Sequence, residues 1–326
     1  MNSKLNICTI GGGTGMPVVN NSLVRAGFTN INSIVTTFDS GGDSGRMRTD
    51  ERGKIMAFSD YWRSLISLWD DGEQKSVWEE MLRFRDGRNR NFGNMFFQFM
   101  SEKEGNLSGV DQLFSKLTGA KINGEVVPAS LEPTDVCFRT KSGKKYVGEH
   151  MMDDLRMSRD TIDEVWLYPM VKANPEVIKV IAAAEVVIIC PGSMYGSVIS
   201  TMLPTGIKES LQKSQSKKIL ITNIMSMANE NHGFDQQKYV EVFNKCLGGA
   251  LNLDLVIMPD FSTLNKAKLN KALKYYEMEN SFPIKYCSEC KDINTVVADV
   301  AIIEPRNMRL RHSENKLSIL LKNLIK

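Results

Sequence analysis

The chain contains a series of short runs of isoleucine, valine and leucine, and each run ends abruptly in small or polar residues. Nearly continuous apolar runs of this length are typical of strands that are buried on both faces of a sheet. Segments with apolar residues at helical spacing lie between the runs, and this alternation predicts a parallel sheet with helices on both faces. The predicted strands are 5–10, 32–38, 185–190, 218–221 and 254–258.

The helical segments complete a Rossmann-like pattern, and we expect a three-layer α/β/α fold with a mostly parallel sheet. One stretch, 121–152, differs because Ser142-Gly143 separates apolar runs, which is a hairpin signal. We interpret this stretch as an antiparallel insertion or an edge of the main sheet. No repeat or flexible linker divides the chain, so residues 1–326 are expected to form a single domain. The predicted helices include 17–26, 55–68, 76–84, 175–184, 206–212 and 236–246.

The totals exclude some classes of protein. A net charge of +3 from 41 basic and 38 acidic residues is too balanced for nucleic acid or an anionic membrane to be the main partner. No apolar run approaches the roughly 20 residues that span a bilayer, and the first residues lack the pattern of a secretory leader. We therefore expect a cytoplasmic protein with reduced cysteines.

The strongest local motif is Gly11-Gly12-Gly13-Thr14-Gly15, directly after a predicted strand and before a predicted helix. Glycines let the backbone approach a ligand, and the N-terminus of the helix offers free N–H groups to a phosphate. The dinucleotide fingerprint needs a glycine where Met16 stands, which disfavours a nicotinamide-dependent oxidoreductase. The alternative is a tight turn that binds nothing.

A second polar motif follows the second predicted strand. Its carboxylates and hydroxyls could hold Mg²⁺ through water, and its arginines suit phosphate oxygens. The alternative is a solvated surface loop, but ligands of α/β sheets bind at the carboxyl ends of strands. The candidate residues here are Asp39, Gly41, Gly42, Asp43, Ser44 and Arg46.

A third motif, Pro191-Gly192-Ser193-x-Tyr195, again lies between a strand and a helix and resembles a second cradle for phosphate or carboxylate. The alternative is a plain turn. Asn223, at the end of the next strand, could bind a base or a sugar.

Cys287-x-x-Cys290 has the spacing of half a zinc site or of a redox pair. Because the sequence offers no second pair nearby, we interpret it as a coincidence.

Taken together, the motifs resemble the CofD/YvcK superfamily, and the resemblance extends over nearly the whole chain. The three loops occur in the family's order, with Gly93-Asn94 between the second and the third. Further matches are Gly124 to Pro128, Gly148-Glu149, Asn223-Ile224-Met225, Tyr276, Pro283-Ile284 and Arg311-His312.

The resemblance implies one of two functions. One branch consists of 2-phospho-L-lactate transferases, which use Mg²⁺ and a deazaflavin acceptor. The other branch, the YvcK type or gluconeogenesis factor, binds UDP-sugars such as UDP-N-acetylglucosamine and links carbon metabolism to cell-wall synthesis and cell shape. The motifs are more similar to the YvcK type. That resemblance implies phosphates near Gly12, Gly13, Thr14, Gly192 and Ser193, with Asn223, Tyr276 and Arg311 near the nucleotide or sugar.

Two departures from the family weaken the case for transfer chemistry. Ser40 stands where the family often has a second aspartate, and Trp62 stands where it usually has an arginine. Our leading hypothesis is a UDP-sugar-binding regulator, with the transferase as the alternative. Asp39, Asp43 and Asp60 are the candidate Mg²⁺ carboxylates, with Asn94 near the ligand, and a homodimer is a further expectation.

Overall fold

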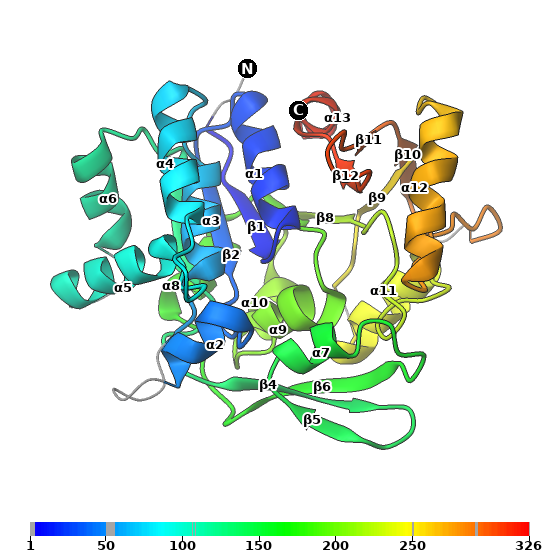
Figure 1. The fold of residues 1–326 in the computed structure, drawn as a ribbon, viewed down its shortest axis with the longest axis horizontal. Helices are drawn as coiled ribbons and strands as arrows, with labels where there is room; N and C mark the ends of the chain where they lie inside the picture. Colours follow the sequence, from blue (N-terminus) through cyan, green and yellow to red (C-terminus); the bar gives the residue numbers. More distant parts are fainter. Residues whose placement is uncertain are drawn as a thin grey trace.

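The computed structural model describes residues 4–49, 56–105, 107, 109–249, 251–290 and 293–325. Its centre is a seven-stranded sheet in the order β10-β9-β8-β7-β1-β2-β3, and each neighbouring pair is parallel (Figure 1). The strands are β1 (Ile7–Gly11), β2 (Ile31–Val35), β3 (Gly124–Pro128), β7 (Val186–Ile189), β8 (Lys217–Ile221), β9 (Leu255–Pro259) and β10 (Thr295–Ala298).

Successive residues of a strand point to opposite faces of the sheet. Both faces are buried, because an apolar core lies on each side. On β1, Ile7 belongs to one apolar core, while Cys8 and Ile10 belong to the other. The first core is closed by α1 (Gly15–Arg25), α3 (Ser59–Ser67), α4 (Glu73–Arg83), α5 (Phe92–Glu104), α6 (Val110–Thr118) and α13 (Glu314–Leu324).

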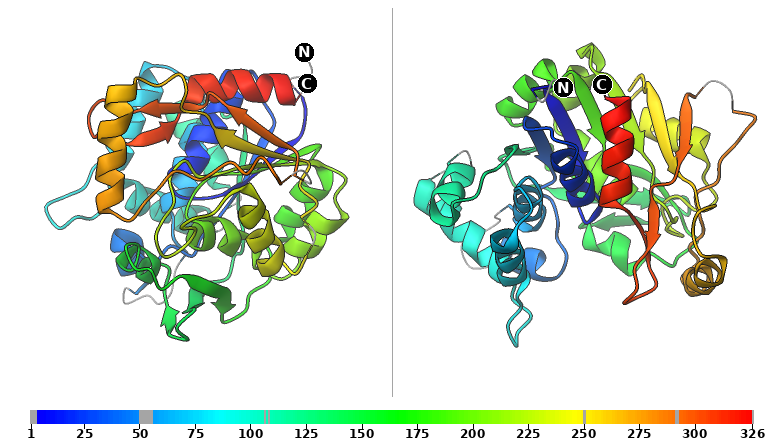
Figure 2. Two further views of the ribbon diagram at one scale, coloured as in Figure 1. Left: turned by 90° about the vertical axis from the view of Figure 1, so that its right-hand side faces the viewer. Right: turned by 90° about the horizontal axis from the view of Figure 1, so that it is seen from above.

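The second core is closed by a different group of helices, so the predicted three-layer α/β/α architecture is confirmed. The C-terminal helix α13 lies beside α1 (Figure 2), where Arg25 forms an ion pair with Glu314 at 3.1 Å. The helices of the second face are α8 (Pro175–Ala183), the π-helix η1 (Met194–Ile199), α9 (Ser200–Met202), α10 (Ile207–Lys213) and α11 (Gln236–Cys246).

The strand order reverses between β1 and β7, which are adjacent in the sheet although their helices cover opposite faces. The loops that follow β1 and β7 therefore separate and leave a crevice outside the carboxyl ends of the strands. The glycine-rich loop after β1 and the Pro191 loop after β7 both open into this crevice.

The two alternatives for 121–152, an antiparallel insertion and an edge of the main sheet, each hold for one part of the stretch. The hairpin of β4 (Asp135–Thr140) and β5 (Lys145–Val147) exists, but β3 pairs in parallel with β2 and belongs to the main sheet. The third strand of the small sheet is β6 (Ile162–Tyr168), which pairs antiparallel with β4 and which the sequence reading left unassigned. The small sheet lies below the carboxyl ends of the main strands in Figure 1.

The remaining elements surround the crevice. They are α2 (Gly42–Arg48), α7 (His150–Asp154), α12 (Lys266–Met278), β11 (Ala301–Ile303) and β12 (Leu310–His312), of which the last two form an antiparallel pair. The predicted helix 55–68 corresponds to α3, and its first residue lies outside the described residues. Within the described part of the chain, no helix is long and apolar enough to cross a membrane.

Candidate functional site

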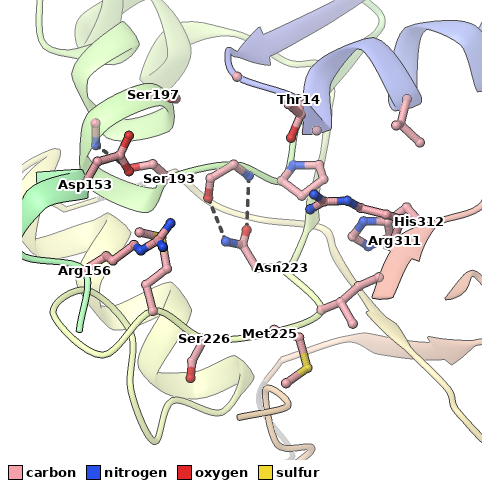
Figure 3. Close-up of a pocket in the computed structure, with 18 of the residues that line it drawn as sticks. Thr14, Asp153, Arg156, Ser193, Ser197, Asn223, Met225, Ser226, Arg311 and His312 are labelled. Carbon is pink, nitrogen blue, oxygen red and sulfur yellow. Dashed lines mark hydrogen bonds between the residues drawn. The ribbon is translucent and has the colours of Figure 1, made fainter. Parts of the chain in front are cut away.

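A cavity of about 460 Å³ occupies the crevice between β1 and β7. Its wall combines the first glycine loop, the Pro191 loop, the segment after β8, and side chains from α3, α7, α12 and β12. Figure 3 shows Thr14, Ser193, Asn223, Arg156 and Arg311 around the same space. The cavity therefore gathers loops that are far apart in the sequence.

The first glycine loop is built for close approach. Gly13 has φ +64°, a conformation that favours glycine, and a Cβ on Gly15 would lie 2.0 Å from the carbonyl oxygen of Pro191. Thr14 precedes α1 without capping it through its side chain, and the first turn of α1 has no acidic residue. The positive end of α1 therefore faces the cavity without a side-chain anion in its own first turn.

The second cradle holds a carboxyl group of the protein itself. Ser193 donates its hydroxyl to Glu230 at 2.6 Å, and the N–H of Met194 donates to the same carboxylate at 2.7 Å. Burial raises the pKa of Glu230 to about 7. Glu230 therefore occupies the start of η1, where the sequence motif predicts a ligand phosphate.

Asn223 joins two loops rather than offering a free amide. Its Oδ1 accepts from the N–H of Gly192 at 3.1 Å, and its Nδ2 donates to the carbonyl of Gly192 at 2.7 Å (Figure 3). Both bonds fix the Pro191 loop against the end of β8. Asn223 lines the cavity as a positioning residue for Gly192.

Carboxylates gather on the side of the cavity nearest α3 and α7. Burial raises the pKa of Asp60 to about 6, with a further increase from Asp39, while Arg63 and a hydrogen bond from Gly13 oppose it. Burial also raises the pKa of Glu149, reinforced by the negative charges of Asp39, Asp153 and Asp60. A cation, a proton or a ligand donor would relieve this repulsion.

Cationic side chains line the same cavity. Arg63 follows Asp60 by one turn of α3 and lies 3.5 Å from it, and Arg156 follows α7. Arg311 enters from β12, whose position is fixed because the Leu310 N–H donates to the Tyr276 hydroxyl at 3.0 Å. Carboxylates and guanidinium groups in one polar cavity suit a ligand that carries phosphates and a cation.

His312 lies next to Arg311 and also lines the cavity. Burial lowers its pKa to about 4, with a contribution from Arg311, so the ring is neutral near pH 7. One ring nitrogen bonds to the backbone of Thr222, and Nε2 is buried without a hydrogen-bond partner among the described residues.

The structure brings many of the sequence-predicted residues to the cavity. Those that line it are Gly13, Thr14, Gly15, Asp39, Asp60, Pro191, Gly192, Ser193, Asn223, Tyr276 and Arg311. Gly11 and Gly12 lie directly before them, and a Cβ on Gly12 would lie 2.5 Å from Asp60. Tyr195 is buried in the second core and its hydroxyl bonds to the carbonyl of Ile162.

Other predicted residues do not line this cavity. Asp43 is buried, and its oxygens accept from Arg46 at 2.6 Å and from the side chain of Asn94 at 2.9 Å. Asn94 also accepts from the indole N–H of Trp62 at 3.0 Å. These residues join α2, α3 and α5. Gly41, Gly42 and Ser44 lie on the α2 side of the same junction.

Several residues at the cavity are not among those predicted from the sequence motifs. Trp62 suggested that a guanidinium is missing, but the neighbouring Arg63 reaches the cavity. Asp153 lies on the short helix α7, with Glu149 directly before it and Arg156 just after it, and their i, i+4, i+7 spacing is the only signal in the sequence. Glu230 had no local signal, because its role depends on the fold bringing it to Ser193.

Comparisons with known proteins give the class of this protein. The model of the 2-phospho-L-lactate transferase CofD family matches residues 7–302. The chain therefore belongs to the CofD/YvcK family, as its motifs indicated.

The curated relatives are named as gluconeogenesis factors. The gluconeogenesis factor of Bacillus subtilis is 29% identical over 334 residues, with full coverage of both chains. A putative gluconeogenesis factor of Nostoc is 30% identical and covers 97% of this chain and 68% of its own. One from Thermotoga maritima is 26% identical, with coverage of 98% and 99%.

Solved structures share the fold. A Bacillus halodurans protein described as a member of the UPF0052 family superposes with a TM-score of 0.83 at 25% identity, covering 97% of this chain and 99% of its own. A second structure of the Bacillus halodurans protein gives a TM-score of 0.84 at 24% identity, covering 98% and 99%.

Proposed function

We propose that this chain binds a UDP-sugar, with UDP-N-acetylglucosamine as the leading candidate, and that it acts as a regulator of carbon metabolism without turning the ligand over. The observation that carries the proposal is the cavity at the strand-order reversal, where the positive end of α1 and several guanidinium groups meet. Nucleotide ligands of α/β sheets bind at such a point. The names of the curated relatives support a role in gluconeogenesis.

The ligand diphosphate is assigned to the first glycine loop. The backbone of Thr14 and Gly15 begins α1, and Arg63 and Arg311 line the same cavity and supply positive charge. The second cradle is a poor site for a phosphate because Glu230 already accepts its donors. The nucleoside or sugar then lies against the polar and apolar segment at Met225 to Met227.

Mg²⁺ is compatible with the carboxylates of the cavity. Asp39 and Asp60 present oxygen ligands near the first glycine loop, whereas Asp43 is directed into the junction with Asn94. Among the described residues, the carboxylate oxygens of Asp39, Asp43 and Asp60 do not all lie within 4.8 Å of one another, as a single ion bound by all three would need. A bound Mg²⁺ would therefore use one or two carboxylates, water and the ligand phosphates, and would offset phosphate charge.

Binding without transfer is favoured by the departure at Ser40, whereas Arg63 supplies a guanidinium to the cavity although Trp62 replaces the family's arginine. Ser40 bonds to His150 through its hydroxyl at 3.0 Å and contributes no charge to a metal. Trp62 is buried and bonds to Asn94. Neither residue can polarise a phosphate in these positions.

A transferase is the second candidate, and one observation favours it. A larger groove of about 1000 Å³ adjoins the cavity and shares Thr14, Val18, Arg63, Arg311 and His312 with it. An acceptor molecule in this groove would lie next to the first glycine loop, as a two-substrate reaction needs.

Calorimetric titration separates the two functions. We expect saturable binding of UDP-N-acetylglucosamine, strengthened by Mg²⁺, with weaker binding of GDP and none of NAD. Incubation with the UDP-sugar should release no product. Absence of UDP-sugar binding together with Mg²⁺-dependent binding of GDP would favour the transferase, which an assay with activated phospholactate and a deazaflavin alcohol then tests.

A further inference from the structure

The segment that follows α12 connects the cavity to the Cys-x-x-Cys motif. Ser281 lines the cavity, and its hydroxyl donates to the carbonyl of Ser226. Three residues later, Ile284 is buried in the second core. The segment is thus anchored before it reaches the cysteines.

The motif is held against the start of α11. The N–H of Cys287 donates to the side chain of Gln236 at 2.8 Å, and the Gln236 amide donates to the Cys287 carbonyl at 2.6 Å. Asp235 pairs with Lys285 in a short parallel bridge. The side chain of Asp235 therefore faces the two cysteines, although about 50 residues separate them in sequence.

These contacts create a group of three metal-ligating side chains. Ligand atoms of Asp235, Cys287 and Cys290 all lie within 4.8 Å of one another, and all three residues are half-buried. Among the described residues, this is the group of metal-ligating side chains that meets this distance limit. It lies outside the ligand cavity. The two sulfurs form a disulfide in this structure, with Cα atoms 5.5 Å apart.

We propose that the reduced form of this motif is a zinc site, with Cys287, Cys290 and Asp235 as ligands and water in the fourth position. Zinc prefers tetrahedral coordination by thiolate, with carboxylate as an accepted ligand, and Cys-x-x-Cys spacing lets two sulfurs bind one ion. The Cα separation allows side-chain rotation to move the sulfurs apart.

Asp235 can serve both the helix and the metal. One carboxylate oxygen accepts from the Lys238 N–H at 2.9 Å and caps α11. The other oxygen has no hydrogen bond among the described residues. The capping bond fixes the carboxylate in place, which is the role that outer hydrogen bonds have around metal ligands.

Oxidation releases the ion in this scheme. A thiolate of Cys290 attacks a low-molecular-weight disulfide, forming a mixed disulfide and releasing one thiolate. Cys287 then attacks the mixed disulfide, forming the protein disulfide and releasing a second thiolate. The two protein sulfurs lose two electrons, the small disulfide gains them, and Zn²⁺ leaves unchanged in oxidation state. The site is therefore present only in the reduced protein.

Metal binding by the full chain tests the site. After reduction and removal of the reductant, the protein should bind one zinc ion per chain, and Co²⁺ in its place should show a thiolate charge-transfer band. Cys290→Ser should lose both signals, and Asp235→Asn should weaken binding at least tenfold. Cys246→Ser is the matched control, because Cys246 lies on the same helix but outside the group.

The oxidised protein should bind no zinc until a thiol reductant restores it. Absence of saturable zinc binding by the reduced wild-type chain would overturn the proposal, as would unchanged binding by Cys290→Ser. Circular dichroism checks that Cys290→Ser is folded, and Cys287→Ser provides a second variant. The measurement needs no nucleotide sugar, so its outcome is independent of the proposed function.

Discussion

Single residues decide how the loops of the cavity meet. Gly15 allows α1 to begin against the Pro191 carbonyl, and Asn223 binds both backbone groups of Gly192. The glycine motif and its strand–helix position could be read from the sequence, because glycine patterns have local causes. The hydrogen-bond partners of these loops could not be predicted from the sequence. Ser193 follows β7 and Glu230 follows β8, and the two residues meet because β8 lies beside β7 in the sheet.

Replacement of Gly15 should damage the fold at the crevice. In Gly15→Ala, the new methyl group would lie 2.0 Å from a backbone oxygen, so the two loops must separate. We expect the free energy of unfolding to fall by about 3 kcal/mol, measured by denaturant titration. Gly87→Ala is the control, since nothing lies within 4 Å of its added Cβ. Equal stability of the two variants would refute the contact.

Arg63 should contribute to ligand affinity although the family motif does not predict it. Arg63→Gln removes a guanidinium from the cavity wall, and affinity for UDP-N-acetylglucosamine should fall about tenfold, as loss of one charged hydrogen bond predicts. Arg139→Gln removes an arginine that pairs with Asp163 on the small sheet. Calorimetry that shows the same affinity for both variants would exclude Arg63 from the site.

At the scale of elements, the parallel strands were predictable and the small sheet was not. Strands such as Val186–Ile189 are buried along their whole length and give continuous apolar runs. Ile162–Tyr168 is half-buried and carries Asp163 and Glu164, so its pattern is weaker. Its pairing with Asp135–Thr140 is a long-range contact that local patterns do not contain.

Arg48 connects α2 to the small sheet and should be important for stability. It is 3% exposed, and it donates to the Thr134 carbonyl at 2.6 Å and to the Asp135 carboxylate at 2.9 Å. Arg48→Ala should lower the free energy of unfolding by about 3 kcal/mol because these acceptors lose a buried charge. Arg46→Ala, at a more exposed arginine of the same helix, should have a smaller effect in the same denaturant titration.

At the scale of the whole molecule, the raised pKa values of buried carboxyl groups predict that stability depends on pH. Burial raises the pKa of Asp60 and Asp111 to about 6 and that of Glu230 to about 7. The folded state then binds more protons than the unfolded state between about pH 4 and pH 7, so stability falls as pH rises through this range. His312 acts in the opposite direction, since its pKa is lowered to about 4.

We therefore expect the melting temperature without ligand to decrease from pH 5 to pH 8. Three groups outweigh the single histidine, and Glu230→Gln should reduce the decrease because it removes the group with the highest of these pKa values. Thermal unfolding followed by circular dichroism in a buffer series measures both. A melting temperature that rises from pH 5 to pH 8 would contradict the raised pKa values of these buried carboxyl groups.

One cavity, at the strand-order reversal, is expected to bind the diphosphate of a nucleotide sugar. A crystal structure of the protein with UDP-N-acetylglucosamine and Mg²⁺ tests it most directly. We expect the diphosphate at the start of α1, next to Gly13 to Gly15 and within reach of Arg63 or Arg311, with Glu230 still bonded to Ser193. A diphosphate at the start of η1 in place of Glu230, or a ligand confined to the adjoining groove, would contradict it.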